Sequence, residues 1–239
     1  MKNLIVGSIV ALSAAMASQP ANAALLFDVY GEAQYWMTDV SGGYGNDENF
    51  NDFQLSDENQ TRLSLAFQHP LPLIPNIRIE TQDMSSYEEF DGTEDAASSP
   101  AELDLSHDTV TLYYTFLDNT LVRLHAGVAA KRFNGFVTDR DGNSWDLEET
   151  IPTAYAMVGA GLPFSGLSVY ARGHLLAIDD SSLRDIEAGI QYRLFSAGGL
   201  LDGNIQVGYR SFSVEFDDVA GLYSDVEFKG PFVGFQLHF

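Results

Sequence analysis

The chain has 239 residues, a formal net charge of −22 and no cysteine. Such an acidic chain lacks the basic footprint that nucleic-acid binding needs, so nucleic acid is excluded as a partner. The absence of cysteine excludes disulfides, thiolate chemistry and an N-terminal lipid-modified Cys. Outside the N-terminus, no stretch has the roughly 18 consecutive apolar residues that a transmembrane helix needs.

Residues 1–23 have the three parts of a secretory signal. Lys2 supplies the positive start, Leu4 to Met16 form the apolar core, and Ala21-Asn22-Ala23 matches a small-x-small cleavage site. The core is too short to span a membrane comfortably. We predict cleavage after Ala23, which leaves one mature domain of residues 24–239.

Ten segments of the mature chain alternate apolar and polar residues, the two-residue period of a β-strand with one apolar face. In the fifth segment, for example, Val122 and Leu124 oppose Arg123 and His125. In chain order the segments are about 27–36, 60–68, 76–84, 107–116, 120–131, 153–162, 167–176, 185–195, 204–212 and 226–239.

The connections between these segments alternate in length. They are long after odd-numbered segments, as in 38–59, 85–106 and 132–151, and mostly short after even-numbered ones. Outer-membrane barrels have short periplasmic turns, longer outside loops and an even number of strands. We therefore predict an all-β fold, a transmembrane antiparallel β-barrel of ten strands, with both termini in the periplasm. Eight strands is the alternative, if the short hairpin of the seventh and eighth segments is misread.

The C-terminus has the pattern of a strand that faces lipid. Val233, Phe235, Leu237 and Phe239 are apolar, and Gly234 and the other intervening residues are small or polar. A soluble domain rarely ends on such residues, because chain ends fray and would expose them. The stretch resembles the C-terminal assembly signal of outer-membrane barrels, which implies the barrel-assembly machinery as a partner.

Charged residues in the strands avoid the apolar face. An Arg or Lys facing lipid at the bilayer midplane costs about 2–4 kcal/mol, whereas a soluble sandwich would place its apolar face inside. We predict a lumen charge network of Glu32, Arg62, Arg78, Glu80, Arg123, His125, Lys131, Arg172, His174, Glu187, Arg193 and Arg210. Ten strands leave a narrow interior that side chains can largely fill. An occluded lumen is the main interpretation. A narrow, net positive pore is the alternative, since bases outnumber acids among these residues.

Most of the acidic residues lie in the long connections. A solvated, self-repelling surface is the main interpretation. The alternative is capture of divalent cations that bridge to lipopolysaccharide phosphates. The segment from Asp139 to Asn143 has part of the spacing of a calcium loop but lacks the full motif. We predict no resident metal and no cofactor.

An enzyme is not expected. Ten-strand outer-membrane proteases carry acid pairs and an Asp–His pair at the outer rim. Here His107-Asp108 begins the fourth segment and Asp83 ends the third, but the spacing of that family is absent. We predict no catalytic residues.

The mature chain resembles small bacterial outer-membrane barrels, and more narrowly a group of proteobacterial outer-membrane proteins identified by a Gly-Gly motif. Gly198-Gly199 is the candidate motif, and Gly42-Gly43 fits less well. The resemblance implies an outer-membrane location, with lipid and lipopolysaccharide as neighbours. It implies no activity. We expect a monomer.

Overall fold

The computed structural model describes residues 27–46, 49–52, 55–88, 101–119, 121–138, 144–178, 181–198, 201–219 and 222–239. The predicted signal segment and the segment from Asp139 to Asn143 lie outside these residues. In the described part of the chain, no helix is long and apolar enough to cross a membrane.

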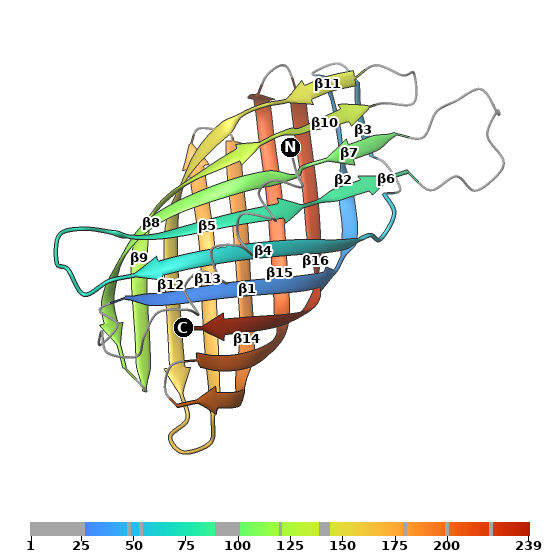
Figure 1. Ribbon diagram of the computed structural model, residues 1–239. Coiled ribbons are helices and arrows are strands. Elements are labelled where there is room, and N and C mark those ends of the chain that lie inside the picture. Colours follow the sequence, from blue (N-terminus) through green and yellow to red (C-terminus); the bar gives the residue numbers. More distant parts are fainter. Residues whose placement is uncertain are drawn as a thin grey trace.

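Within the described residues, ten antiparallel strands close into one barrel (Figure 1). The first and last strands close it, with pairs running from Tyr30–His238 to Trp36–Phe232. The predicted ten-stranded barrel is confirmed. In order around the barrel, the strands are β1 (Asp28–Met37), β4 (Asn59–Gln68), β5 (Asn76–Asp83), β8 (His107–Asp118), β9 (Val122–Phe133), β12 (Thr150–Gly161), β13 (Leu167–Ile178), β14 (Ser181–Ala197), β15 (Leu201–Val219) and β16 (Leu222–His238).

The strands run further than the sequence pattern predicted. A four-stranded sheet in the order β11-β10-β7-β6 extends the hairpins on one side, while β2 pairs with β16 and β3 pairs with β2. We expected loops at 38–59, 85–106 and 132–151, and this was wrong, because each contains strands. The added strands are β2 (Asp39–Asn46), β3 (Asn49–Asp52), β6 (Ser85–Tyr87), β7 (Glu102–Asp104), β10 (Gly135–Thr138) and β11 (Ser144–Leu147).

Strand β2 continues β1 along the same partner. Trp36 pairs with Phe232 and Asp39 pairs with Lys229, so two residues lie between the two pairs on each side and the register does not shift. The interruption lies opposite Pro231, which has no N–H to donate to the ladder. Residues 28–46 therefore form one long, interrupted strand against β16.

The barrel has two different ends. The strand ends that the short connections join lie at one end, together with the C-terminus. These ends are Gln68 and Asn76, Asp118 and Val122, Gly161 and Leu167, and Ala197 and Leu201. There Val29 and Phe239 exchange two backbone hydrogen bonds, of 3.1 and 2.9 Å. We call this the short-turn end. The other end, at the upper right of Figure 1, carries β6, β7, β10 and β11, and we call it the long-hairpin end.

Candidate functional site

The outer face of the barrel carries a belt of exposed apolar side chains. On β16, Val233 and Phe235 are each 39% exposed, while Phe232 before them and Gln236 after them are buried inside the barrel. The belt continues around the barrel through Tyr35, Ile79, Val110, Leu112, Leu124, Val128, Val158, Val169, Ile190 and Val207. A closed barrel satisfies all backbone groups of its strands, and only such a barrel can present apolar strands to lipid. The chain is a transmembrane β-barrel of the outer-membrane type.

The belt ends sharply on its long-hairpin side. Along β15, outward residues change from Tyr209, which is 51% exposed, to Ser211. On the neighbouring strand, Lys229 donates to Glu227 over 3.0 Å, and Ser211 donates to Glu227 over 3.1 Å. The hydrogen bond from Lys229 lowers the pKa of Glu227 below its ordinary value. Because charged residues avoid the lipid face, β14, β15 and β16 continue beyond the membrane from this level.

Glu32 lies at the centre of the buried polar side chains in the lumen. It forms an ion pair with Arg172 and accepts a hydrogen bond from Arg62 over 3.4 Å. Gln206 and Gln236 each donate to its other oxygen over 3.3 Å. These four partners come from β4, β13, β15 and β16, so a single carboxylate joins distant parts of the barrel wall. A buried carboxylate needs such partners, because desolvation without them would be costly.

Glu187 is the second buried carboxylate of this layer. Arg62 donates to it over 2.5 Å, Arg172 lies 2.7 Å from it, and the Gln34 amide lies 3.4 Å from it. Each arginine therefore bridges Glu187 and Glu32. This arrangement places guanidinium groups across the middle of the lumen.

A second group of charges lies nearer the long-hairpin end. Asp185 accepts hydrogen bonds from Arg210 over 2.8 and 3.0 Å and from Lys131 over 2.9 Å. Arg210 also donates to Gln82 over 2.7 Å, and Lys131 Nζ lies 3.2 Å from His107 Nε2. The cavity among these side chains measures only about 10 Å³. That is at the lower limit of the space that one water molecule requires.

The structure places the predicted lumen residues in two groups. Ten are buried inside the barrel: Glu32, Arg62, Arg78, Glu80, His125, Lys131, Arg172, His174, Glu187 and Arg210. Arg123 and Arg193 lie instead at the short-turn end, where the Arg193 side chain is 54% exposed. Arg123 and Arg193 lie apart from the other ten because each is close to the end of its strand, next to a short turn.

Sequence reasoning missed Asp185. It lies two residues before Glu187, and that spacing on a strand puts both carboxylates on the same face. With Asp185 included, the described barrel strands bury five bases against four acids in the lumen. The bases are Arg62, Arg78, Lys131, Arg172 and Arg210, and the acids are Glu32, Glu80, Asp185 and Glu187. The numbers of buried bases and acids are therefore nearly equal, and the large excess of bases that suggested a positive pore is absent from the described lumen.

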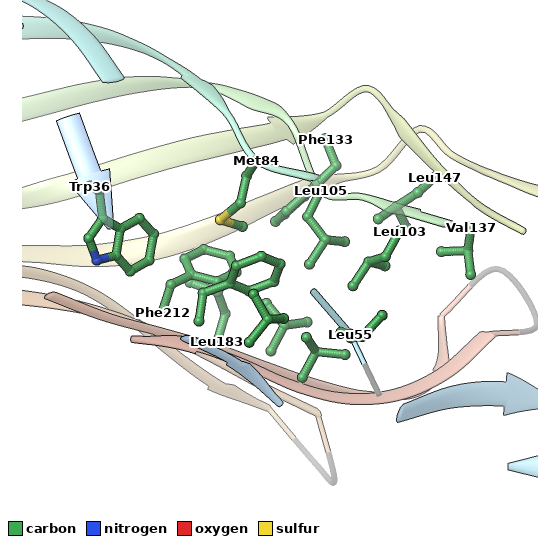
Figure 2. Close-up of a cluster of buried hydrophobic side chains, with 14 of the residues drawn as sticks. Trp36, Leu55, Met84, Leu103, Leu105, Phe133, Val137, Leu147, Leu183 and Phe212 are labelled. Carbon is green, nitrogen blue, oxygen red and sulfur yellow. The ribbon is translucent and has the colours of Figure 1, made fainter. Parts of the chain in front are cut away.

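The long-hairpin half of the lumen is apolar, whereas we expected a polar interior throughout. Trp36, Phe212 and Phe228 belong to one buried cluster that also includes Met84 and Phe133 (Figure 2). The cluster continues beyond the barrel strands through Leu103, Leu105, Val137 and Leu147. The expectation of a polar interior was wrong here because Phe212 and Phe228 lie on the same strand face as the inward polar residues, not on the face of the outward apolar ones.

The apolar cluster rests directly on the second charge group. The guanidinium of Arg210 lies 4.6 Å from the Trp36 ring centroid, within the range of a cation–π contact. The Trp36 indole donates a hydrogen bond to the Gly230 carbonyl over 3.1 Å. Trp36 and Arg210 are each 1% exposed. The charged and apolar layers thus pack together without a gap at this point.

A vestibule opens at the short-turn end. It has a volume of about 620 Å³, and its polar lining includes Tyr30, Arg123, Gln191, Asp202 and Asn204. The turn at 162–166 forms one side of it. A second cavity of about 580 Å³ lies at the long-hairpin end, along β13 to β16, where Arg184 and Glu227 line it.

The residues that would have formed a protease-like cluster do not share a face. His107 points into the lumen, is 2% exposed, and lies 2.9 Å from the Leu105 carbonyl. Asp108, its neighbour in the strand, points to the opposite face, and so does the exposed Asp83. In the described ranges, no group of three or more His, Cys, Asp or Glu residues is arranged to hold a metal ion.

No protein family and no curated protein sequence matches the chain. Among solved structures, the outer membrane protease OmpT of Escherichia coli is similar over 89% of this chain and 97% of its own, with 10% identity and a TM-score of 0.46. The outer membrane protein OprG of Pseudomonas aeruginosa is similar over 89% of this chain and 95% of its own, with 17% identity and a TM-score of 0.35. Ail, the attachment invasion locus protein of Yersinia pestis, covers 90% of this chain and 100% of its own, with 12% identity and a TM-score of 0.34. At these scores, no role is transferred to this chain from any of them.

Proposed function

We propose that the protein is an occluded outer-membrane barrel with a structural or surface-interaction role. The observation that carries this proposal is the double closure of the lumen. A layer of paired charges, with a cavity of only about 10 Å³, lies directly beneath a buried apolar cluster. An ion crossing this path would have to displace ion pairs and then enter apolar surroundings, and both steps are unfavourable.

The long-hairpin end would serve as the interacting part. Strands β6, β7, β10 and β11 hold the hairpins together as a sheet, and buried Leu103, Val137 and Leu147 give that sheet an apolar interior. A folded extension of this kind can present a defined surface outside the membrane. Lipopolysaccharide is the expected neighbour, with divalent cations as bridges between loop carboxylates and lipid phosphates.

We propose the usual orientation of an outer-membrane barrel, with the short-turn end in the periplasm. Export would depend on residues 1–23 as a cleaved signal, and assembly on the C-terminal stretch from Val233 to Phe239. We further propose that the chain belongs to the Gly-Gly-motif group that its sequence resembles, with Gly198-Gly199 as the motif. Gly198 has φ +63°, a conformation that favours glycine.

A narrow channel is the alternative. The vestibule favours it, because about 620 Å³ of the short-turn end is open rather than filled by side chains. A channel would require the two closing layers to move apart. An enzymatic role is not proposed, since His107, Asp83 and Asp108 do not form a common site.

A liposome-swelling assay separates these two functions. Refolded residues 24–239 would be placed in vesicles that are then diluted into isotonic arabinose or glycine. The occluded barrel predicts the same swelling rate as protein-free vesicles. Swelling that rises with the amount of barrel, folded as judged by its gel mobility before boiling, would establish the channel instead.

A further inference from the structure

The vestibule contains a positively charged group with little hydrogen bonding. In the described residues, the Arg123 guanidinium has one hydrogen-bond partner, Ser168, at 3.4 Å. A guanidinium carries five N–H donors, so most of the hydrogen-bonding capacity of Arg123 is unused. Gly159 lies beside it, and a Cβ at that position would lie 3.1 Å from Arg123 Nε. The glycine therefore leaves space for the guanidinium along the wall.

The same vestibule contains a carboxylate with an unused acceptor. Asp202 Oδ1 is buried and has no hydrogen-bond partner among the described residues. Its other oxygen lies 3.9 Å from both Arg193 Nε and His238 Nδ1, which is too long for a hydrogen bond. Neither oxygen of the Asp202 carboxylate therefore accepts a hydrogen bond within the described part of the chain, and a ligand that donates to this carboxylate would supply the missing partner.

Tyr30 and His238 provide a flat surface beside Asp202. Their rings stack with centroids 4.3 Å apart and an angle of 4° between the planes. His238 Nε2 also lies 2.9 Å from Asp28, which holds the imidazole in place. Asn204 and Gln191 add amide groups to the vestibule wall. The site thus combines a fixed aromatic surface with side chains that can both donate and accept hydrogen bonds.

We propose that the vestibule binds a small zwitterion, a molecule of the amino-acid or short-peptide class. Its carboxylate would pair with Arg123, and its ammonium group would pair with the Asp202 carboxylate, whose side chain is 22% exposed. The volume of about 620 Å³ falls within the roughly 300–1,000 Å³ typical of small-molecule sites. A ligand with both charges satisfies both groups at once, whereas a simple anion or cation satisfies one and leaves the other unpaired.

Binding at this site does not depend on whether the lumen conducts, because calorimetry measures binding at equilibrium and needs no transport through the barrel. The Arg123 group lies on β9, β12 and β13, and Asp202 lies on β15 beside the stacked Tyr30 and His238. Neither belongs to the buried network around Glu32 and Glu187. Substitutions in the vestibule are therefore separable from the closure of the barrel.

The test is calorimetry on refolded residues 24–239 in a nonionic maltoside detergent, with glycylglycine as the probe. Acetate and methylamine serve as probes that carry only one of the two charges. We expect glycylglycine to bind at least tenfold more tightly than either. Arg123→Gln and Asp202→Asn should each weaken glycylglycine binding at least tenfold. Arg184→Gln and Asp225→Asn, at the opposite end of the barrel, are the matched controls and should bind as the unaltered protein does.

The proposal is overturned if the folded barrel shows no binding of glycylglycine at 10 mM, roughly the weak limit of a useful small-molecule site. It is also overturned if acetate binds as tightly as glycylglycine, since Asp202 then contributes nothing. Equal binding by Arg123→Gln and the unaltered protein would exclude Arg123. Gel mobility before boiling confirms that each variant is folded. If Arg123→Gln proves unstable, Arg123→Lys is used in its place, and because it keeps the charge it should retain part of the affinity.

Discussion

Arg62 on β4 and Glu187 on β14 form an ion pair across the lumen, with 2.5 Å between Nη2 and Oε2 and 125 positions between them in the chain. Both side chains are almost fully buried, at 7% and 2% exposure. The pair joins strands that are not neighbours in the barrel wall. It therefore ties opposite sides of the barrel together and fills the space between them.

Glu187→Ala should destabilise the barrel strongly. The substitution leaves Arg62 and Arg172 without their shared carboxylate, and removing one partner of a buried ion pair costs about 3–5 kcal/mol. Urea unfolding of the barrel in lipid vesicles measures the change. The exposed Glu215→Ala is the control and should stay within about 0.5 kcal/mol. A loss below about 1 kcal/mol for Glu187→Ala would show that the network is not the support we describe.

The double variant Arg62→Ala with Glu187→Ala should cost less than the sum of the two single variants. Groups that contact each other have a coupling energy of about 0.5–3 kcal/mol, and the double variant removes both charges together. Additive costs would mean that the two side chains act independently despite their 2.5 Å separation.

Gly230→Ala should prevent correct folding or shift the urea midpoint sharply. An added Cβ would lie 1.8 Å from the Met37 carbonyl oxygen, where β1 gives way to β2, so the backbone would have to move. Overpacking of this kind costs about 1–3 kcal/mol, and more where backbone is involved. Gly31→Ala is the matched control, because a Cβ there has nothing within 4 Å. Equal refolding yields for the two variants would contradict the close approach of these strands.

Trp36 should be shielded from water-soluble quenchers. The chain has two tryptophans, so in the Trp145→Phe variant all tryptophan emission comes from Trp36. Trp36 is 1% exposed inside the apolar cluster, so we expect blue-shifted emission that acrylamide quenches poorly in the folded barrel. Phe212→Ala removes a large neighbour from the cluster and should increase quenching. Strong quenching in the single-tryptophan barrel would contradict a closed apolar layer.

Cysteine labelling tests the orientation, because the natural chain has no cysteine. Ser144→Cys lies at the long-hairpin end and Asn119→Cys lies in a short turn, and both positions are exposed. A membrane-impermeant maleimide should label Ser144→Cys on intact cells, and label Asn119→Cys only after lysis. The reverse pattern would show that the short-turn end faces outward.

The strand pattern was readable from sequence because lipid outside and polar groups inside impose a strict two-residue period. That period alone predicts that Arg62, Arg172 and Glu187 lie on the lumen side, and all three are buried there. It could not predict that Arg62 reaches Glu187, since this depends on which strands face each other across the barrel.

Beyond the membrane, the two-residue period has the opposite orientation, with apolar side chains inside and polar ones outside. Around Met84 and Leu103 the apolar side chains point inward and the outward ones are polar, as in a soluble sheet. Apolar residues are sparse there among turn-forming and acidic ones, so β6, β7, β10 and β11 were read as loops. Phe212 and Phe228 could have indicated the apolar part of the lumen, because they lie on the same strand face as the inward-pointing Arg210.

The occlusion of the lumen is tested most directly by planar bilayer recording of the refolded barrel in salt solution. Insertion would be verified by the gel mobility of the same preparation before boiling. We expect no current steps above the bare bilayer, because the ion pairs around Glu32 and Glu187 and the cluster around Trp36 both close the path. Discrete and reproducible steps from the unaltered barrel would contradict the closed lumen and establish a channel.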